Sequence, residues 1–348
     1  EIITCDWSSD VCSSDLIAAV STTCMREGIV LYDKDGQEIW ACANVDARSD
    51  DEVAQLVHMN PELEKQIYRE SGQTYALGAL PRLFWVKNKM PEVYEKTAMC
   101  TMFNDWLIYK MTGVFSSEPS NACTTGIFDL KARDWDDQIA ASIGLKTGIF
   151  PKISECGTVV AQVGAKGAEE TGLAEGTPVV AGGGDAQLGC VGVGVVDANQ
   201  AAIFGGSFWQ YEYNTDEAKT DEHCRVRVNC HSVPGIWQYE ALAFKPGMVM
   251  RWYRDAFCQY EKELSKTTGR DPYDLMNEKA KDIPAGCYGM MCAFSDVMNY
   301  ISWRHASPMF INFDFDPDKF NRYTFYRAIM ENTAMVTYGH MQLVREST

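Results

Sequence analysis

The stretch Pro178-Val179-Val180-Ala181-Gly182-Gly183-Gly184-Asp185 decides the fold class of this chain. A short apolar run ends in three glycines, and the small residues of 186–194 follow directly. This pattern predicts a buried strand, a sharp glycine turn and a closely packed helix. Asp185 then stands in the first turn of the helix, either as a capping carboxylate or as a strand-end carboxylate that accepts a proton from a substrate hydroxyl.

A second glycine turn, Gly205-Gly206-Ser207, follows the predicted strand 201–204. Backbone N–H groups together with a hydroxyl suit phosphate oxygens, although a plain tight turn has the same composition. Two such turns at the ends of adjacent strands, one of them with a carboxylate, favour a phosphoryl-transfer cleft. The chain contains neither the P-loop motif nor the protein-kinase catalytic set, which excludes both of those classes.

Strands and helices are predicted on both sides of this centre, which indicates a mixed α/β architecture with a domain boundary near residue 198. One helix is expected to begin at Pro91, run through Trp106 and end near Gly113. Apolar alternation and turn residues give strands at 17–24, 28–33, 39–44, 225–229, 236–243 and 309–315. Further helices are expected at 134–143, 168–172, 246–265, 273–281 and 323–345. The turn Lys34-Asp35-Gly36 is expected to connect strands 28–33 and 39–44 in a hairpin.

Composition narrows the possible functions. The chain has 348 residues, which favours two domains, and its 48 acidic residues against 31 basic ones argue against a nucleic-acid binder. No apolar run is long enough to span a membrane. The 13 cysteines form no C-x-x-C pair and the five histidines lack metal-ligand spacing, so we expect reduced thiols in a cytoplasmic protein and no metal-ligand cluster.

The adjacent pair Arg26-Glu27 lies at the junction of two predicted strands. It is either a solvent-exposed turn or a guanidinium and carboxylate that grip vicinal hydroxyls, one group donating and the other accepting. Asp46 and Arg48, just past the third strand, are expected in a surface loop, with the alternative that they line the same cleft.

The two ends of the sequence are unusual. Residues 1–16 contain the short duplication 8–15 and show no strand or helix periodicity, so we interpret them as a non-native segment. The last predicted helix shows no capping signal before Thr348. We therefore expect the chain to be an internal fragment of a longer protein.

Taken together, these motifs resemble the FGGY carbohydrate kinases. The resemblance covers residues 17–348 and rests on segments in the right order: 24–28, 81–86, 104–107, 112–113, 119–122, 134–135, 184–185, 205–207 and 247–252. It implies an actin-like ATPase (ribonuclease H-like) fold of two α/β domains around a nucleotide cleft, here truncated at both ends. The domains would span residues 17–197, with the substrate and the catalytic base, and 198–348, on the nucleotide side.

The resemblance also implies site residues and ligands. Asp185 matches the family's catalytic base, Arg26 and Glu27 its substrate-hydroxyl ligands, Gly205, Gly206 and Ser207 its second phosphate loop, and Gly247 a backbone contact to the nucleotide phosphates. ATP and Mg²⁺ would be the cofactors, and a small sugar-like molecule would be the substrate.

Within the family, segments 25–32, 40–48, 182–185, 251–258 and 310–312 resemble the members that phosphorylate the quorum-sensing signal autoinducer-2, 4,5-dihydroxy-2,3-pentanedione. Pentuloses such as xylulose, and glycerol, stay open as substrates because the residues around Asp185 do not separate them. A non-catalytic sugar-binding or regulatory protein on the same fold is the alternative from another class.

Two departures from the family pattern matter. Gly206 takes the place of a threonine in the second phosphate loop, so Ser207 would have to supply the hydroxyl. The N-terminal Asp-Gly-Thr-type phosphate hairpin and the C-terminal region that wraps adenosine have no counterpart in this sequence. We therefore expect the chain as written to bind ATP poorly and to show no kinase activity.

Overall fold

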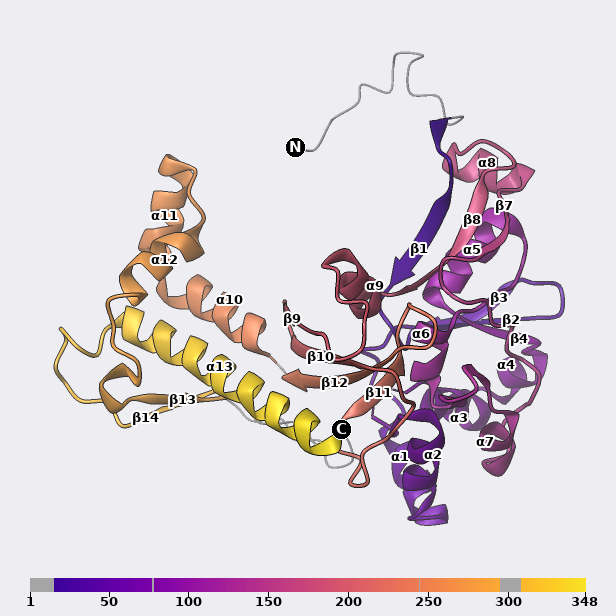
Figure 1. Cartoon of the computed structure of the whole chain (residues 1–348), viewed down its shortest axis with the longest axis horizontal. Helices are drawn as coiled ribbons and strands as arrows, with labels where there is room; N and C mark the ends of the chain where they lie inside the picture. Colours follow the sequence, from indigo (N-terminus) through magenta and orange to yellow (C-terminus); the bar gives the residue numbers. More distant parts are fainter. Residues whose placement is uncertain (1–15, 77, 244, 295–307) are drawn as a thin grey trace. The chain divides into compact units, whose positions relative to one another are not determined.

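A computed structural model describes residues 16–348 except 77, 244 and 295–307 (Figure 1). The chain divides into two compact units, unit 1 with residues up to Gln200, 214–220 and 228–238, and unit 2 with 201–213, 221–227 and 239–348. The proposed non-native segment lies almost entirely outside the described residues.

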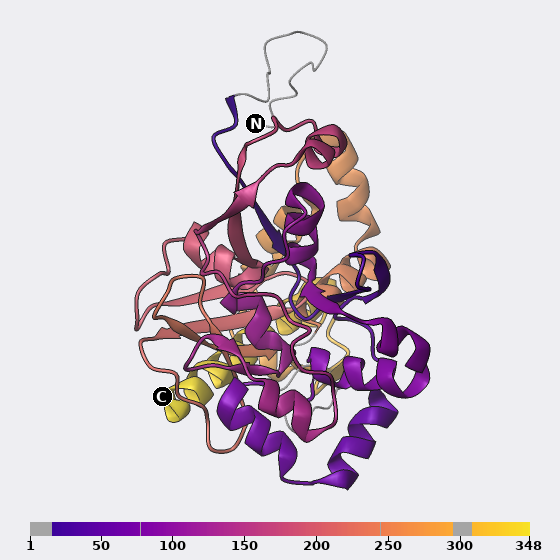
Figure 2. The ribbon, with the colours of Figure 1, turned by 90° about the vertical axis from the view of Figure 1, so that its right-hand side faces the viewer.

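The sheet of unit 1 that carries the glycine-rich stretch has the order β1-β8-β7. Strand β1 (Val20–Cys24) pairs parallel with β8 (Pro178–Gly184), and β7 (Val159–Gln162) pairs antiparallel with β8. Helix α5 (Phe103–Thr112) packs against β1 and β8, and the turned view of Figure 2 shows it beside them. The predicted first strand is thus confirmed, with its end next to the end of β8.

A second sheet of unit 1, in the order β3-β2-β4, contains the predicted hairpin. Strands β2 (Ile29–Tyr32) and β3 (Glu38–Cys42) are antiparallel, and Gly36 adopts the left-handed conformation that their turn requires (φ 74°). The third strand, β4 (Met99–Met102), pairs antiparallel with β2.

Strand β4 shows that the single helix predicted from Pro91 to Gly113 is wrong. Helix α4 (Pro91–Lys96) ends early, β4 follows, and α5 begins a new helix at Phe103. The free edge of β2 is the physical reason, because residues 99–102 satisfy its backbone groups and bury Cys100 and Met102. The predicted ends are correct, since Pro91 stands in the first turn of α4 and Gly113 caps α5 with a left-handed φ of 73°.

Helices within residues 50–96 and 137–142 contribute buried side chains to a core of unit 1 that includes Leu56, Ile67 and Leu83. The helix predicted over 134–143 begins only at Asp137, because 134–135 pairs as a strand with residues 128–129. The remaining helices of unit 1 are α1 (Asp50–Met59), α2 (Leu63–Ser71), α3 (Ala79–Lys89), α6 (Pro119–Ala122), α7 (Asp137–Ser142), α8 (Ala165–Thr171) and α9 (Asp185–Gly192). The remaining strands are β5 (Phe128–Asp129) and β6 (Asp134–Trp135).

Unit 2 begins with the antiparallel pair β9 (Ala201–Gly205) and β10 (Trp209–Thr215), of which β10 was not predicted. The helix expected over 246–265 is broken at Cys258, whose backbone leaves the helical region (φ −114°, ψ 48°). Strands β11 (Arg227–Cys230) and β12 (Trp237–Ala243) have residues in both units. The other elements of unit 2 are α10 (Pro246–Phe257), α11 (Gln259–Thr268), α12 (Pro272–Ala280), β13 (Met291–Ala293), β14 (Met309–Ile311) and α13 (Arg322–Ser347).

The core of unit 2 joins α10, α12 and α13 through buried side chains that include Tyr253, Met276 and Ile329. Among the described residues, no helix combines the length and the apolar character needed to cross a membrane.

Candidate active site

The three glycines before Asp185 belong to strand β8, so the predicted glycine turn is wrong. None of them has a positive φ. A Cβ on Gly182 would overlap the carbonyl oxygen of Thr22 in β1, and a Cβ on Gly183 would lie 2.5 Å from the Ser232 hydroxyl oxygen. The glycines are therefore required by the close approach of neighbouring segments, rather than by backbone curvature.

Asp185 is the first residue of α9, and Gly184 occupies the N-cap position. The capping alternative therefore does not hold for Asp185. Its side chain is 59% exposed, and Oδ1 accepts a hydrogen bond from the backbone N–H of Ala186 (2.9 Å). The same oxygen lies 3.6 Å from Nε of Arg26. The structure thus presents an accessible carboxylate at the end of a buried strand, beside a guanidinium.

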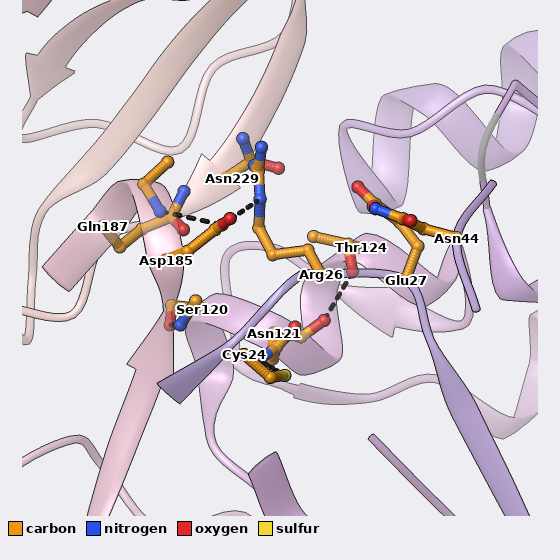
Figure 3. Close-up of polar contacts among 12 residues, drawn as sticks. Cys24, Arg26, Glu27, Asn44, Ser120, Asn121, Thr124, Asp185, Gln187 and Asn229 are labelled. Atoms are coloured by element: carbon orange, nitrogen blue, oxygen red, sulfur yellow. Dashed lines mark hydrogen bonds and ion pairs between the residues drawn. The ribbon is translucent and has the colours of Figure 1, made fainter. Parts of the chain in front are cut away.

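Arg26 and Glu27 are buried, which contradicts the alternative of a solvent-exposed turn. They lie between β1 and β2, and Glu27 has a left-handed backbone (φ 64°) that is uncommon outside glycine. The Glu27 Oε2 accepts a hydrogen bond from Nδ2 of Asn44 (3.4 Å). Figure 3 shows Arg26 between Asp185 on one side and Glu27 with Asn44 on the other. The three predicted residues are therefore neighbours in one site of unit 1.

A buried carboxylate that the sequence analysis missed anchors the end of β8. Glu118 caps α6, and its Oε2 accepts hydrogen bonds from the backbone N–H (2.6 Å) and the hydroxyl (2.7 Å) of Ser120. The Ser120 hydroxyl oxygen in turn accepts a bond from the N–H of Gly184 (3.0 Å). Glu118 and Ser120 thus fix the residue directly before Asp185. In the sequence, Ser120 lies in the segment 119–122 that supports the family resemblance, and Pro119 marks the start of a helix directly after Glu118.

The other acids of this region, Glu118 and Asp105, are fully buried and out of reach of a substrate, and the Cys24 thiol is not a base at neutral pH. Burial raises the pKa of Glu118, and raises that of Asp105 well above its usual range. Burial also raises the pKa of the Cys24 thiol to about 12, so this thiol stays protonated at neutral pH. Asp185 is left as the accessible acid next to Arg26.

Asp46 and Arg48 form an ion pair, and the bond from Arg48 lowers the pKa of Asp46. The Arg48 guanidinium lies 4.9 Å from the Trp85 ring centroid and 5.9 Å from that of Trp40. The pair thus packs on aromatic rings, two and four residues along the chain from Asn44.

The residues predicted for the nucleotide lie together in unit 2. Gly205 ends β9, and the N–H of Gly206 donates to the carbonyl of Phe208 (2.8 Å) across the turn before β10. A Cβ on Gly247, in the first turn of α10, would overlap the carbonyl oxygen of Gly206. The turn 205–207 and the N-terminus of α10 are therefore in contact, an arrangement that suits a phosphate. However, β9 and β8 belong to different sheets. The prediction that the two glycine-rich stretches end adjacent strands is therefore wrong.

A metal site receives no support from side-chain clusters, since the described residues contain no group of three or more His, Cys, Asp or Glu that could hold an ion. For a nucleotide, the exposed turn 205–207 beside the N-terminus of α10 is the feature that fits, because Gly247 lets the two approach with no side chain between them.

Comparison with known proteins decides the family. The family model described as "FGGY family of carbohydrate kinases, N-terminal domain" matches residues 4–192. The chain belongs to this family. The resemblance inferred from the sequence is therefore confirmed.

Among curated proteins, the chain is 48% identical over 322 residues to an autoinducer-2 kinase from Enterobacter sp. (strain 638), covering 92% of this chain and 61% of that protein. It is 47% identical over 331 residues to an autoinducer-2 kinase from Yersinia pestis bv. Antiqua (strain Angola), covering 95% and 62%. This FGGY chain thus spans about three fifths of the length of these relatives.

Solved structures show the fold. The chain matches xylulose kinase from Rhodospirillum rubrum with a TM-score of 0.80 at 21% identity, covering 95% of this chain and 65% of that one. It matches Plasmodium falciparum glycerol kinase with ADP with a TM-score of 0.79 at 18% identity, covering 95% and 65%. The fold is therefore the mixed α/β fold of FGGY kinases, present in part.

His231 provides a pH-dependent test of the core of unit 1. The side chain is fully buried, its Nδ1 accepts the N–H of Val233 (2.9 Å), and burial lowers its pKa to about 4. A lowered pKa means that the unfolded chain binds the proton more tightly, so stability present above pH 6.5 is lost as the pH falls towards 4. We expect His231 to account for a loss of about 2 kcal/mol between pH 7.5 and pH 5.

The measurement is urea unfolding of the chain and of a His231→Gln variant at both pH values. The buried acids Asp105 and Glu118, whose pKa values are raised, act in the opposite direction, so only the difference between the two proteins isolates His231. Equal pH dependence in both proteins would contradict a buried, neutral His231.

Proposed function

We propose that the protein phosphorylates autoinducer-2, transferring the γ-phosphoryl group of ATP to the primary hydroxyl of 4,5-dihydroxy-2,3-pentanedione to give the 5-phosphate. The observation that carries the proposal is the exposed Asp185 carboxylate at the start of α9, 3.6 Å from the buried Arg26. The identity of 47–48% to autoinducer-2 kinases supports this substrate over other polyols.

Each side chain has a chemical task in this reaction. Asp185 accepts the proton of the attacking hydroxyl, which makes its oxygen a better nucleophile. Arg26 carries only donors, so it binds the carbonyl and hydroxyl oxygens of the substrate, whereas the Glu27 carboxylate accepts from a hydroxyl. The substrate has two carbonyls beside two hydroxyls, which matches a site that both donates and accepts.

The nucleotide would be held from unit 2. The backbone of Gly205, Gly206 and Ser207 and that of Gly247 would contact the phosphates of ATP. When bound, Mg²⁺ neutralises charge on the transferring group. The proposal includes the actin-like arrangement of two α/β domains, 17–197 and 198–348, and a cytoplasmic location.

Titration calorimetry with three ligands tests the substrate. We expect the chain to bind 4,5-dihydroxy-2,3-pentanedione more tightly than xylulose or glycerol, because the dione offers two carbonyl oxygens to the Arg26 guanidinium. The titrations contain no ATP, since Arg26 and Glu27 both lie in unit 1. Binding of xylulose or glycerol without binding of the dione would contradict autoinducer-2 as the substrate. Phosphoryl transfer itself is assayed in a chimera in which residues 17–348 replace the matching segment of the Enterobacter autoinducer-2 kinase.

The double variant Arg26→Ala, Glu27→Ala is expected to weaken binding of the dione by about a hundredfold and to leave ATP binding within about twofold. The reason is that the pair lies beside Asp185 in unit 1, whereas the proposed phosphate contacts lie in unit 2. Calorimetry on the chimera measures both affinities.

The matched control removes another charged pair of unit 1. Lys65 in α2 and Glu62 at its N-cap form an exposed ion pair, and Lys65→Ala with Glu62→Ala should leave both affinities unchanged. Equal losses of dione and ATP affinity in the Arg26, Glu27 variant would show that this pair is structural.

A further inference from the structure

Arg82 in α3 makes an unusual set of hydrogen bonds for a buried arginine. Its side chain is 3% exposed, and its guanidinium donates to four backbone carbonyls. These carbonyls belong to Glu27 (3.1 Å from Nη1), Gly78 (3.4 Å from Nη1), Asp46 (3.2 Å from Nε) and Asn44, which accepts from Nη2. One side chain therefore joins three segments of unit 1.

Two of these segments carry the polar groups next to Arg26. Glu27 lies between β1 and β2, and Asn44 follows β3, and their side chains meet at 3.4 Å. The left-handed backbone of Glu27 is a conformation that persists only when its surroundings hold it. Arg82 donates hydrogen bonds to the carbonyls of Glu27, Asn44 and Asp46, and these bonds stabilise the backbone conformation of Glu27.

We propose that Arg82 is a positioning residue for substrate recognition, because it fixes Glu27 and Asn44 in the orientation that accepts a substrate hydroxyl. This inference rests on the function proposed above. A planar guanidinium with five donors can serve four carbonyls at once, whereas a lysine has three donors on a single nitrogen and cannot span them. Lysine at this position should therefore keep the charge and lose the alignment.

Arg133 offers a matched comparison within unit 1. It is also mostly buried, pairs with Glu155 (2.7 Å), and donates to the carbonyls of His231 (3.1 Å) and Ile236 (3.2 Å). Its partners lie at residues 155, 231 and 236, whereas those of Arg82 lie at residues 27, 44, 46 and 78. Loss of the Arg133 guanidinium should therefore lower the stability of unit 1 without changing substrate binding.

A double-mutant cycle on the full chain tests the proposal, with 4,5-dihydroxy-2,3-pentanedione as the probe in titration calorimetry. Arg82→Lys is expected to lower affinity about tenfold in the unaltered chain, and less than about twofold when Glu27→Gln is already present. Arg133→Lys should lower the urea midpoint and leave affinity within about twofold. Additive effects of the Arg82 and Glu27 substitutions would overturn the proposal.

Hydrogen exchange provides a readout that needs no ligand. Arg82→Lys should speed amide exchange in peptides covering 24–30 and 42–48, whereas Arg133→Lys should not. If the unaltered chain binds no polyol, the proposed function fails, and exchange alone then decides whether Arg82 holds these two segments. Unchanged exchange in both peptides would overturn the proposal, whatever the binding data show.

Discussion

Asp185→Asn is expected to abolish phosphoryl transfer by the chimera, with kcat lowered by about a thousandfold or more. The amide has nearly the same shape as the carboxylate, but it cannot take the proton of the attacking hydroxyl. Because the side chain is 59% exposed at the start of α9, the substitution should change the free energy of unfolding by less than about 0.5 kcal/mol.

The experiment compares steady-state rates and dione affinity for three versions of the chimera: unaltered, Asp185→Asn and Asp35→Asn. Asp35 is an exposed carboxylate in the turn between β2 and β3, and its loss should leave both quantities unchanged. Dione affinity should also stay within a few-fold in the Asp185 variant, because Arg26 and Glu27 remain. Turnover within a few-fold of the unaltered chimera would remove Asp185 from the mechanism.

Gly182→Ala is expected to destabilise unit 1 by more than about 3 kcal/mol. The new methyl group would overlap the carbonyl oxygen of Thr22, so β1 and β8 could not keep their parallel pairing. The hydroxyl of Thr23, which donates to the Gly183 carbonyl (3.0 Å), would lose its partner as well. Since β1 leads directly into Arg26, affinity for the dione should fall together with stability.

Gly192→Ala is the matched control for this prediction. Gly192 ends α9, a Cβ there would meet nothing within 4 Å, and its φ is not positive. Alanine favours a helix over glycine, so this variant should be as stable as the unaltered chain or slightly more stable. Equal urea midpoints for the Gly182 and Gly192 variants would show that β1 and β8 do not approach as closely as the structure has them.

The sequence by itself determined the features that depend on a few neighbouring residues. The Lys34-Asp35-Gly36 turn, Pro91 at the start of α4 and Gly113 at the end of α5 were predicted correctly, because backbone conformation at such positions follows from the residue itself. The order and spacing of the motifs also identified the FGGY family, which the family match confirms.

Only the tertiary structure decided how the candidate site is built. Strand β4 exists because β2 has an edge to pair, and the glycines of β8 are needed because Thr22, 160 residues earlier than Gly182, approaches their backbone. The Glu118–Ser120–Gly184 connection and the four carbonyls around Arg82 likewise join segments that are distant in the chain. Steric exclusion and hydrogen bonding between distant segments leave no local pattern, because they depend on the partner that folding brings into contact.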